Sequence, residues 1–61
     1  MTVQELKAFR KELGMTQKEL AGAIGVSRQF LGMCECSREP ITYLVSERVT
    51  KLIQLKRMME S

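Results

Sequence analysis

The apolar residues of this chain recur every three or four positions, which is the spacing of one face of an α-helix. The first such series comprises Val3, Leu6, Phe9 and Leu13. It predicts a helix over 2–13, with Phe9 as its anchor in the core. Thr2 and Glu5 have the spacing of a capping box at its start. Gly14 is the expected C-terminal stop, because glycine readily enters the left-handed conformation that ends many helices.

The stretch 16–36 predicts two short helices joined by a tight turn. Thr16 and Glu19 form a second capping-box pair, in which each side chain accepts a hydrogen bond from the backbone N–H of the other residue. Gly25 is positioned to end this helix. Ser27 is positioned to cap the next helix, which should run to about the end of the stretch. This arrangement is a helix-turn-helix candidate.

The helix expected after Ser27 has two different faces. Its core face carries Leu31, Cys34 and Glu35, and the opposite face carries Arg28, Gln29, Gly32 and Met33. The second face has almost no core-forming residues and is therefore available for contacts outside the domain. Phe30 flanks the core face. We expect it to pack locally, with a contact outside the domain or a partner subunit as alternatives.

The pattern becomes helical again after Pro40, which cannot continue a helix. From about residue 42 to residue 59 it allows one long helix, or a short turn followed by a helix over about 46–59 that Ser46 caps. We favour the second arrangement. The expected inward stripe consists of Val45, Val49, Leu52 and Ile53. Further apolar residues exceed what a small core can cover and indicate an interface; they are Leu55, Met58 and Met59.

Composition supports one all-α domain spanning 1–61. The 61 residues are 44% hydrophobic and 28% charged, which is typical of a folded helical protein. No apolar run approaches the roughly 18 residues of a membrane span, and we expect neither a membrane association nor a signal peptide. We therefore expect a cytoplasmic protein. Ten Lys and Arg residues and a net charge of +3 suit a polyanionic partner.

Other functional classes find little support in the residue types. The chain has no His, so an enzyme using His as acid, base or activator of a nucleophile is excluded. Cys34 and Cys36 supply two thiolates, whereas a structural zinc site requires four ligands, and the two side chains point to different sides of a helix. A zinc site is therefore disfavoured. A disulfide between them is equally disfavoured. We expect no metal, no cofactor and no small-molecule ligand.

Several of these residues together resemble the Xre and Cro type of helix-turn-helix DNA-binding proteins, which includes phage repressors, Cro proteins and restriction-modification controller proteins. The resemblance is carried by Phe9-Arg10, the run GMTQKELAGAIGVSRQFL, Glu35 and Pro40. It implies a compact four- to five-helix bundle, lambda-repressor-like, whose third helix enters the major groove. This chain departs from the family at Ser37, where glycine is usual, and at Cys34, where a larger side chain is common.

The exposed face of the third helix then becomes the candidate site for reading DNA bases. Arg28 can donate two hydrogen bonds to guanine, and Gln29 can pair with adenine. Met33 can contact a thymine methyl group, which is also one of the alternative contacts of Phe30. Arg28 could instead hold a phosphate, and either polar residue could simply be solvated.

The expected contacts to the DNA backbone come from Gln17, Ser27 and Arg38. Gln17 lies in the first turn of a helix, where free N–H groups and the helix dipole attract anions. In the repressors that the chain resembles, a glutamine at this place contacts phosphate. The resemblance also implies a partly buried structural salt bridge between Arg10 and Glu35.

Together these features predict a sequence-specific regulator of transcription that binds double-stranded DNA. It would be a homodimeric repressor or autoregulator on a pseudo-palindromic operator, associated with the nucleoid when bound. The expected dimer interface comprises Leu52, Leu55, Met58 and Met59. The alternative is a protein-interaction module on the same fold, such as an antitoxin or an antirepressor-like adaptor. RNA binding is less favoured, because the stacking aromatics of common RNA modules are absent.

Overall fold

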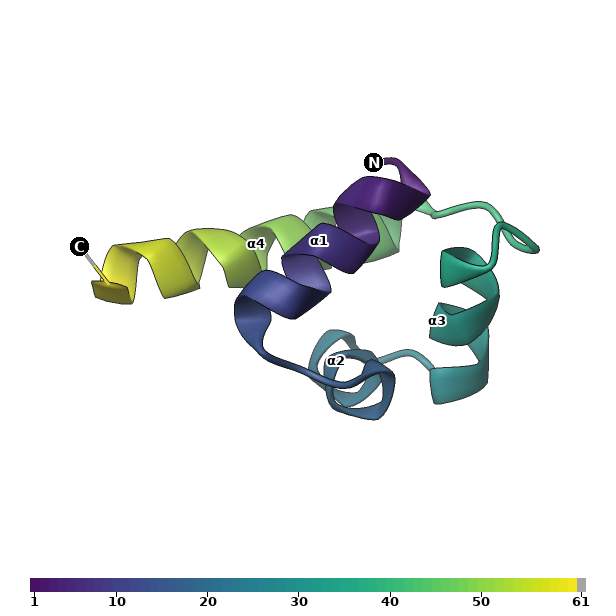
Figure 1. The fold of residues 1–61 in the computed structure, drawn as a ribbon, viewed down its shortest axis with the longest axis horizontal. Helices are drawn as coiled ribbons and strands as arrows, with labels where there is room; N and C mark the ends of the chain where they lie inside the picture. The colour runs from purple at the N-terminus through teal and green to yellow at the C-terminus, as the bar shows by residue number, and fades with distance from the viewer. Residues whose placement is uncertain (61) are drawn as a thin grey trace.

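The computed structural model describes residues 1–60, which form four helices and no strand. The helices are α1 (Val3–Leu13), α2 (Gln17–Ile24), α3 (Arg28–Glu35) and α4 (Tyr43–Glu60). The long helix α4 runs along the molecule behind α1, and α2 and α3 pack beneath them (Figure 1). The all-α bundle is therefore confirmed, with four helices. Within the described residues, no helix combines the length and apolar character needed to cross a membrane.

Both predicted capping boxes are present. The Thr2 hydroxyl accepts from the Glu5 N–H at 3.1 Å, and the Thr16 hydroxyl accepts from the Glu19 N–H at 3.2 Å. In return, the backbone N–H of each threonine donates to the carboxylate of its glutamate at 2.9 Å. The backbone N–H of Thr2, donating to the Glu5 carboxylate, lowers the pKa of that carboxyl. These local signals fix where α1 and α2 begin.

The glycines predicted to end these helices do so. Gly14 and Gly25 have φ angles of 69° and 76°, in the left-handed region. The Gly25 N–H returns to the Ala21 carbonyl, as does the N–H of Val26. The short turn between α2 and α3 therefore closes on backbone hydrogen bonds, which sets the direction in which α3 leaves.

The core lies where all four helices meet. Its fully buried members are Leu6, Leu20, Ala21, Ile24, Leu31, Cys34, Val45 and Val49. The prediction that Phe9 anchors α1 is wrong, because Leu6 occupies the centre of the crossing. Phe9 is only partly buried and packs against the edge of the cluster.

The prediction of a helix capped by Ser46 is also wrong. Helix α4 is continuous from Tyr43, and the Thr42 hydroxyl accepts from the Val45 N–H at 3.3 Å. Ser46 lies inside the helix, where its N–H donates to the Thr42 carbonyl. Val45 explains the difference, because it is fully buried, and burying it requires the helix to begin before Ser46.

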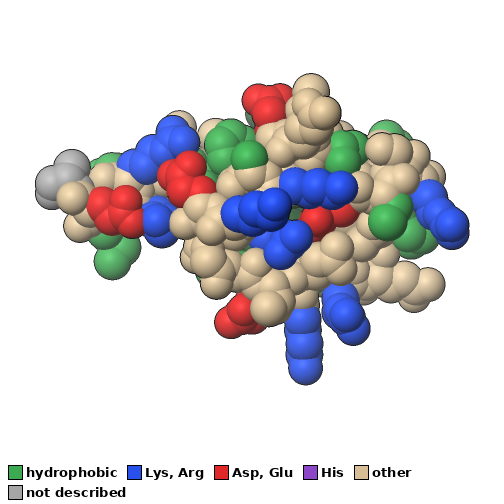
Figure 2. Space-filling view, in the orientation of Figure 1, with side chains coloured by type: hydrophobic (Ala, Val, Ile, Leu, Met, Phe, Trp, Pro, Cys, Tyr) green, Lys and Arg blue, Asp and Glu red, His purple; other side chains and the backbone are tan. Residues whose placement is uncertain are grey.

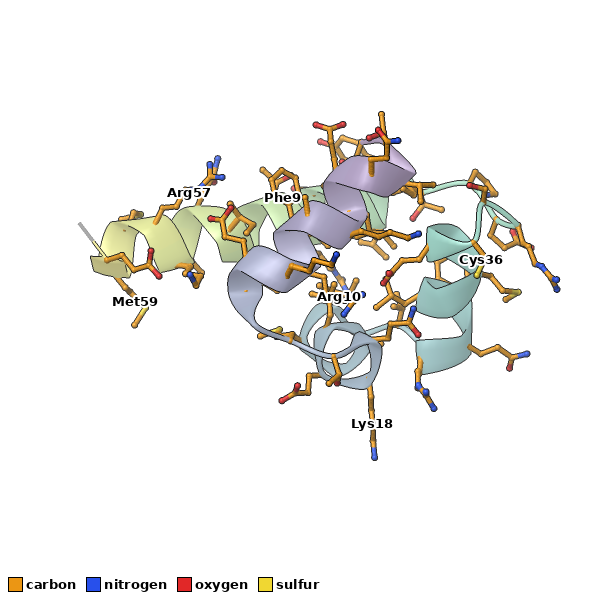
Figure 3. All side chains as sticks on the ribbon, in the orientation of Figure 1. Phe9, Arg10, Lys18, Cys36, Arg57 and Met59 are labelled. Carbon is orange, nitrogen blue, oxygen red and sulfur yellow. The ribbon has the colours of Figure 1, made fainter. Side chains whose placement is uncertain are left out.

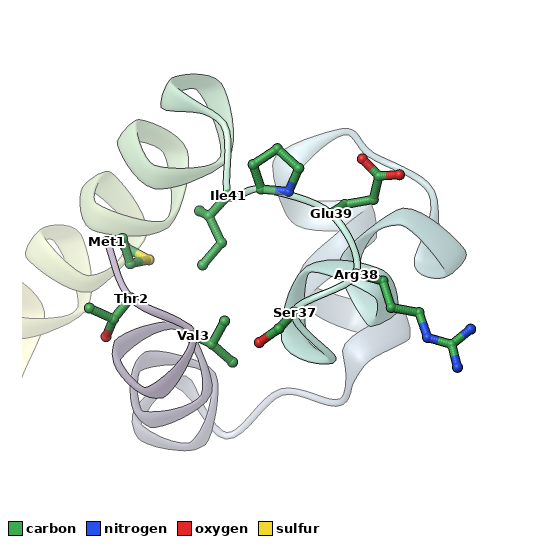
Figure 4. A pocket seen from close by; sticks show the side chains of 8 residues that line it. Met1, Thr2, Val3, Ser37, Arg38, Glu39 and Ile41 are labelled. Atoms are coloured by element: carbon green, nitrogen blue, oxygen red, sulfur yellow. The ribbon is translucent and has the colours of Figure 1, made fainter.

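The loop from α3 to α4 contains a strained residue. Ser37 has a φ of 63°, and among residues 1–60 it is the only non-glycine residue with a positive φ. It is exposed and lines an open hollow of about 470 Å³ between the start of α1 and this loop (Figure 4). This is the position at which the proteins that the chain resembles usually have glycine.

Replacing Ser37 by glycine is expected to raise the free energy of unfolding by about 0.5–1 kcal/mol. The left-handed conformation costs an L-residue about 1–2 kcal/mol, and the greater freedom of glycine in the unfolded chain takes back about 0.4–1 kcal/mol. Thermal unfolding followed by circular dichroism measures the change. Ser37→Ala is the control, since it removes the hydroxyl but keeps the strain. A glycine variant no more stable than the alanine variant would contradict this account.

Candidate nucleic-acid interface

Helix α3 is held against α1 by the predicted salt bridge. Arg10 Nε donates to Glu35 Oε2 at 3.0 Å, and Arg10 Nη2 donates to Glu35 Oε1 at 3.3 Å. A further bond runs from Arg10 Nη1 to the Met15 carbonyl at 3.1 Å. Arg10 therefore ties α3 both to α1 and to the loop that leads into α2. Glu35 is 4% exposed, so its charge depends on this guanidinium for compensation.

The other end of α3 is fixed by Ser27. Its hydroxyl accepts from the Phe30 N–H at 3.0 Å, which confirms the predicted N-cap. Arg28 and Gln29 form the first turn after this cap, and both are exposed. The first turn of α3 thus presents a guanidinium and an amide to solvent.

Five of the predicted contact residues line two adjoining surface hollows of about 420 and 470 Å³. The full lining of the two is Gln17, Arg28, Gln29, Gly32, Met33, Cys36 and Arg38. Ser27, the sixth predicted residue, is exposed beside them as the cap of α3. The structure therefore brings together residues that the sequence spreads over 22 positions, from Gln17 to Arg38.

Gln17 reaches from α2 across to α3. Its side-chain oxygen lies 3.7 Å from where a Cβ on Gly32 would stand, and Gln17 is partly buried there. The small size of Gly32 thus lets this side chain lie close to the backbone of α3. Gln17 is the link between the start of α2 and the exposed face of α3.

The charge on this face is positive. None of the residues lining the two hollows is acidic, and two of them are arginines. Figure 2 shows Lys and Arg side chains over α1 and below α2 and α3. Lys18 is among the basic residues there and extends away from the first turn of α2 (Figure 3). A polyanion approaching α3 would meet cations on the flanking elements as well.

The loop after α3 completes the site. The backbone N–H of Arg38 donates to the Met33 carbonyl at 2.9 Å, which folds the loop back onto the last turn of α3. Arg38 consequently lines the same hollow as Met33, and its side chain is exposed. A cation and a thioether are thereby held side by side.

Cys36 is the site residue that the sequence analysis did not identify. It is the C-terminal cap of α3, is exposed, and lines the hollow with Met33. Its position two residues after Cys34 bore only on metal binding and on a disulfide, neither of which it favoured. Cys34 is fully buried, and this burial, reinforced by the negative charges of Glu39 and Glu35, raises the pKa of its thiol.

Phe30 does not belong to the exposed face. It is partly buried and packs against the core, as the sequence analysis expected first. The protein-interaction alternative depended on Phe30 and Met33 as apolar contacts. Because Phe30 packs against the core and does not line the two hollows, Met33 is the one of these two apolar residues that lies on the exposed face, between polar and basic neighbours.

Comparisons with known proteins agree with this geometry. Residues 6–35 match the family model described as Helix-turn-helix, which covers α2, the turn and α3. A protein of Methanothermobacter thermautotrophicus named as an uncharacterized HTH-type transcriptional regulator is 35% identical over 48 residues. The aligned region covers 79% of this chain and 70% of that protein. No solved structure matches the chain significantly.

Proposed function

This chain belongs to the Xre-type helix-turn-helix family of DNA-binding proteins, and on that premise we propose that it regulates transcription by reading a pseudo-palindromic DNA operator as a homodimer. The observation that carries the proposal is the acid-free face on which Arg28 and Gln29 project from the first turn of α3 beside Gln17. Guanidinium and amide groups are the side chains best suited to base edges in the major groove.

Base contacts are assigned to Arg28, Gln29 and Met33. The two polar residues stand at the N-terminal end of α3, the part of a recognition helix that contacts base edges in this class of protein. Each bidentate pair, with guanine or with adenine, would contribute about 1–3 kcal/mol of discrimination. Met33 lies one turn later in the adjoining hollow, where its thioether would contact a thymine methyl group.

Contacts to the phosphate backbone are assigned to Gln17, Ser27 and Arg38. Gln17 is the first residue of α2, where backbone N–H groups are free and the helix dipole is positive. Ser27 caps α3, and Arg38 presents its charge from the loop on the other side of the hollow. Contacts on both sides of α3 would set its depth and angle in the groove, while the base contacts choose the sequence.

The second copy is proposed to bind at the end of α4. An apolar hollow of about 600 Å³ lies between the C-terminal parts of α1 and α4. Its lining consists of Leu13, Met15, Leu52, Leu55, Lys56, Met59 and Glu60. Leu55 is 50% exposed, and Met58 and Met59 are 71% and 86% exposed. Apolar side chains so open to water favour a partner that covers them.

This surface is suited to a copy of itself. In a two-fold dimer the same patch meets itself, so it must carry both a ridge and a groove. Leu55 and Met59 on α4 supply the ridge, and the hollow bordered by Leu13 supplies the groove. Lys56 and Glu60 at its rim pair with each other within the chain, and two antiparallel copies would also place each cation near the acid of the other. To read two successive major grooves, such a dimer has to hold its two α3 helices about 34 Å apart.

The effect of such a dimer on transcription depends on where its operator lies relative to a promoter. Bound over a promoter, it would block or position the polymerase, and its own gene would be a natural target. We therefore propose a repressor or autoregulator whose output depends on its concentration.

Selection of bound sequences from a random duplex pool tests the proposed function. The wild type is expected to enrich one motif with two-fold symmetry. Gln29→Ala should relax one base pair in each half-site, because the amide that pairs with adenine is lost. Gln54→Ala is the matched control, since it removes an exposed glutamine from α4, outside the site. It should enrich the wild-type motif unchanged.

Two other results would contradict parts of the proposal. A wild-type chain that enriches no motif would defeat specific DNA recognition altogether. A Gln29→Ala variant that loses affinity evenly across sequences would move Gln29 from base contact to phosphate contact.

A further inference from the structure

Arg48 of α4 is bonded to the end of α2. Its Nη1 donates to the Ile24 carbonyl at 2.6 Å, across 24 positions of sequence. Ile24 is the last residue of α2, so its carbonyl is one of the backbone groups that a helix leaves without an internal partner. The bond therefore joins α4 to the turn of the helix-turn-helix.

The charge of Arg48 is matched to this place. The C-terminal end of a helix carries partial negative charge, and basic side chains in the last turn commonly compensate it. Helix α2 has no basic residue in its own last turn, whereas α1 has Arg10 and Lys11 there. Arg48 supplies from another helix the cation that α2 lacks.

Gly25 leaves room for this contact. A Cβ at Gly25 would stand 2.9 Å from Arg48 Nη1. The glycine thus has two roles, since it adopts the left-handed φ of the turn and keeps open the space that the guanidinium occupies. Three residues later comes Arg28, the first residue of α3.

We propose that Arg48 is a positioning residue for DNA recognition, which fixes the direction of α3 by holding the turn at Ile24 and Gly25 against α4. The proposal rests on the proposed function, because it concerns how that reading face is oriented. Arg48 itself touches no base in this scheme. Its loss lets the first turn of α3 shift, so that Arg28 and Gln29 meet the base edges poorly.

The test uses four variants of the full chain. Arg48→Ala removes the bond, and Arg48→Lys restores a cationic donor at the same place. Lys51→Ala is the matched control for charge, since it removes an exposed cation one turn further along α4. Val49→Ala is the control for stability, because it trims a fully buried side chain and leaves both partners of the Arg48–Ile24 bond in place. All measurements are made at a temperature at which each variant is fully folded by circular dichroism.

The first readout compares two duplexes of equal length, the one that the wild type enriches from a random pool and a scrambled one. Arg48→Ala is expected to lose about tenfold in affinity for the enriched duplex, because both base-reading side chains are displaced, and little for the scrambled one. Arg48→Lys should recover most of the loss. Lys51→Ala and Val49→Ala should keep the wild-type ratio between the duplexes. Equal losses of Arg48→Ala on both duplexes would make Arg48 a phosphate contact and overturn the proposal.

The second readout needs no DNA. The Gly25 and Val26 N–H groups donate to the Ala21 carbonyl, and the Phe30 N–H donates to the Ser27 hydroxyl. Amide hydrogen exchange at these three residues in the free protein should accelerate in Arg48→Ala by about tenfold, and not in Lys51→Ala. Unchanged exchange there would overturn the proposal whatever the DNA result. A wild type that enriches no duplex would overturn the proposed function. If Arg48→Ala nevertheless exchanged faster, Arg48 would hold the turn without a role in DNA reading, and the proposal made here would be overturned separately.

Discussion

Replacing Glu35 by alanine is expected to lower the midpoint of thermal unfolding by about 10–25 °C. The substitution leaves the Arg10 guanidinium, whose side chain is 21% exposed, facing the space of a lost carboxylate. Removing one partner of a buried pair costs about 3–5 kcal/mol, and partial exposure of Arg10 reduces this to about 2–4 kcal/mol. In a domain of this size each kcal/mol shifts the midpoint by about 4–8 °C.

The expected loss is a large part of the total free energy of unfolding of such a chain. At about 0.05–0.15 kcal/mol per residue, a domain of 61 residues has a free energy of unfolding of about 3–9 kcal/mol. Glu47→Ala is the matched control, because Glu47 is exposed on α4, and its loss should change stability by less than about 0.5 kcal/mol. Unchanged stability of Glu35→Ala together with an altered DNA motif would contradict a structural role for the pair.

Replacing Leu55 by glutamate is expected to dissociate the proposed dimer and to weaken binding to a two-half-site operator by about 100-fold. Two linked half-site contacts gain about 10²–10⁴ in affinity over one, and the variant forfeits this gain. A carboxylate facing the apolar hollow of the partner copy would lose its water, and Lys56, the cation at the rim of that hollow, is already paired with Glu60. Sedimentation velocity measures the dissociation, and titration of the duplex measures the affinity.

Thr50→Glu is the matched control for Leu55→Glu. Thr50 is exposed on α4 and lines a different hollow, so the variant adds the same charge away from the proposed interface. Both variants should bind a single half-site as the wild type does. A wild type that sediments as a monomer both free and on DNA would refute the proposed dimer.

Local chemistry made α1, α2 and α3 predictable from the sequence. The Thr16–Glu19 capping box and Gly25 each act within one turn of helix, so their spacing alone places the ends of α2. The start of α4 had no such unique signal, because Thr42 and Ser46 are both acceptable caps. Burial of Val45 decided between them, and burial is a property of the whole bundle.

The positions of side chains relative to other helices were harder to predict. Periodicity shows that Leu6 and Phe9 share a face of α1, but the crossing with the other helices determines that Leu6 is central. The exposed face of α3 was predictable from periodicity, but no pattern indicated that Cys36 or the contact of Arg48 with Ile24 belongs near it. Neither depends on local spacing.

The last turns of α4 have a consequence for how the protein responds to its own abundance. After Ile53 none of the described residues of α4 is buried, and two ion pairs, Lys56 with Glu60 and Arg57 with Glu12, lie on its surface there. So short a helical segment is marginal in water without packing. In the proposed dimer, dilution would therefore unwind the end of α4 as well as separate the subunits. Operator occupancy would then rise more steeply than in proportion to the protein concentration, so regulation would set in over a narrow range of concentration.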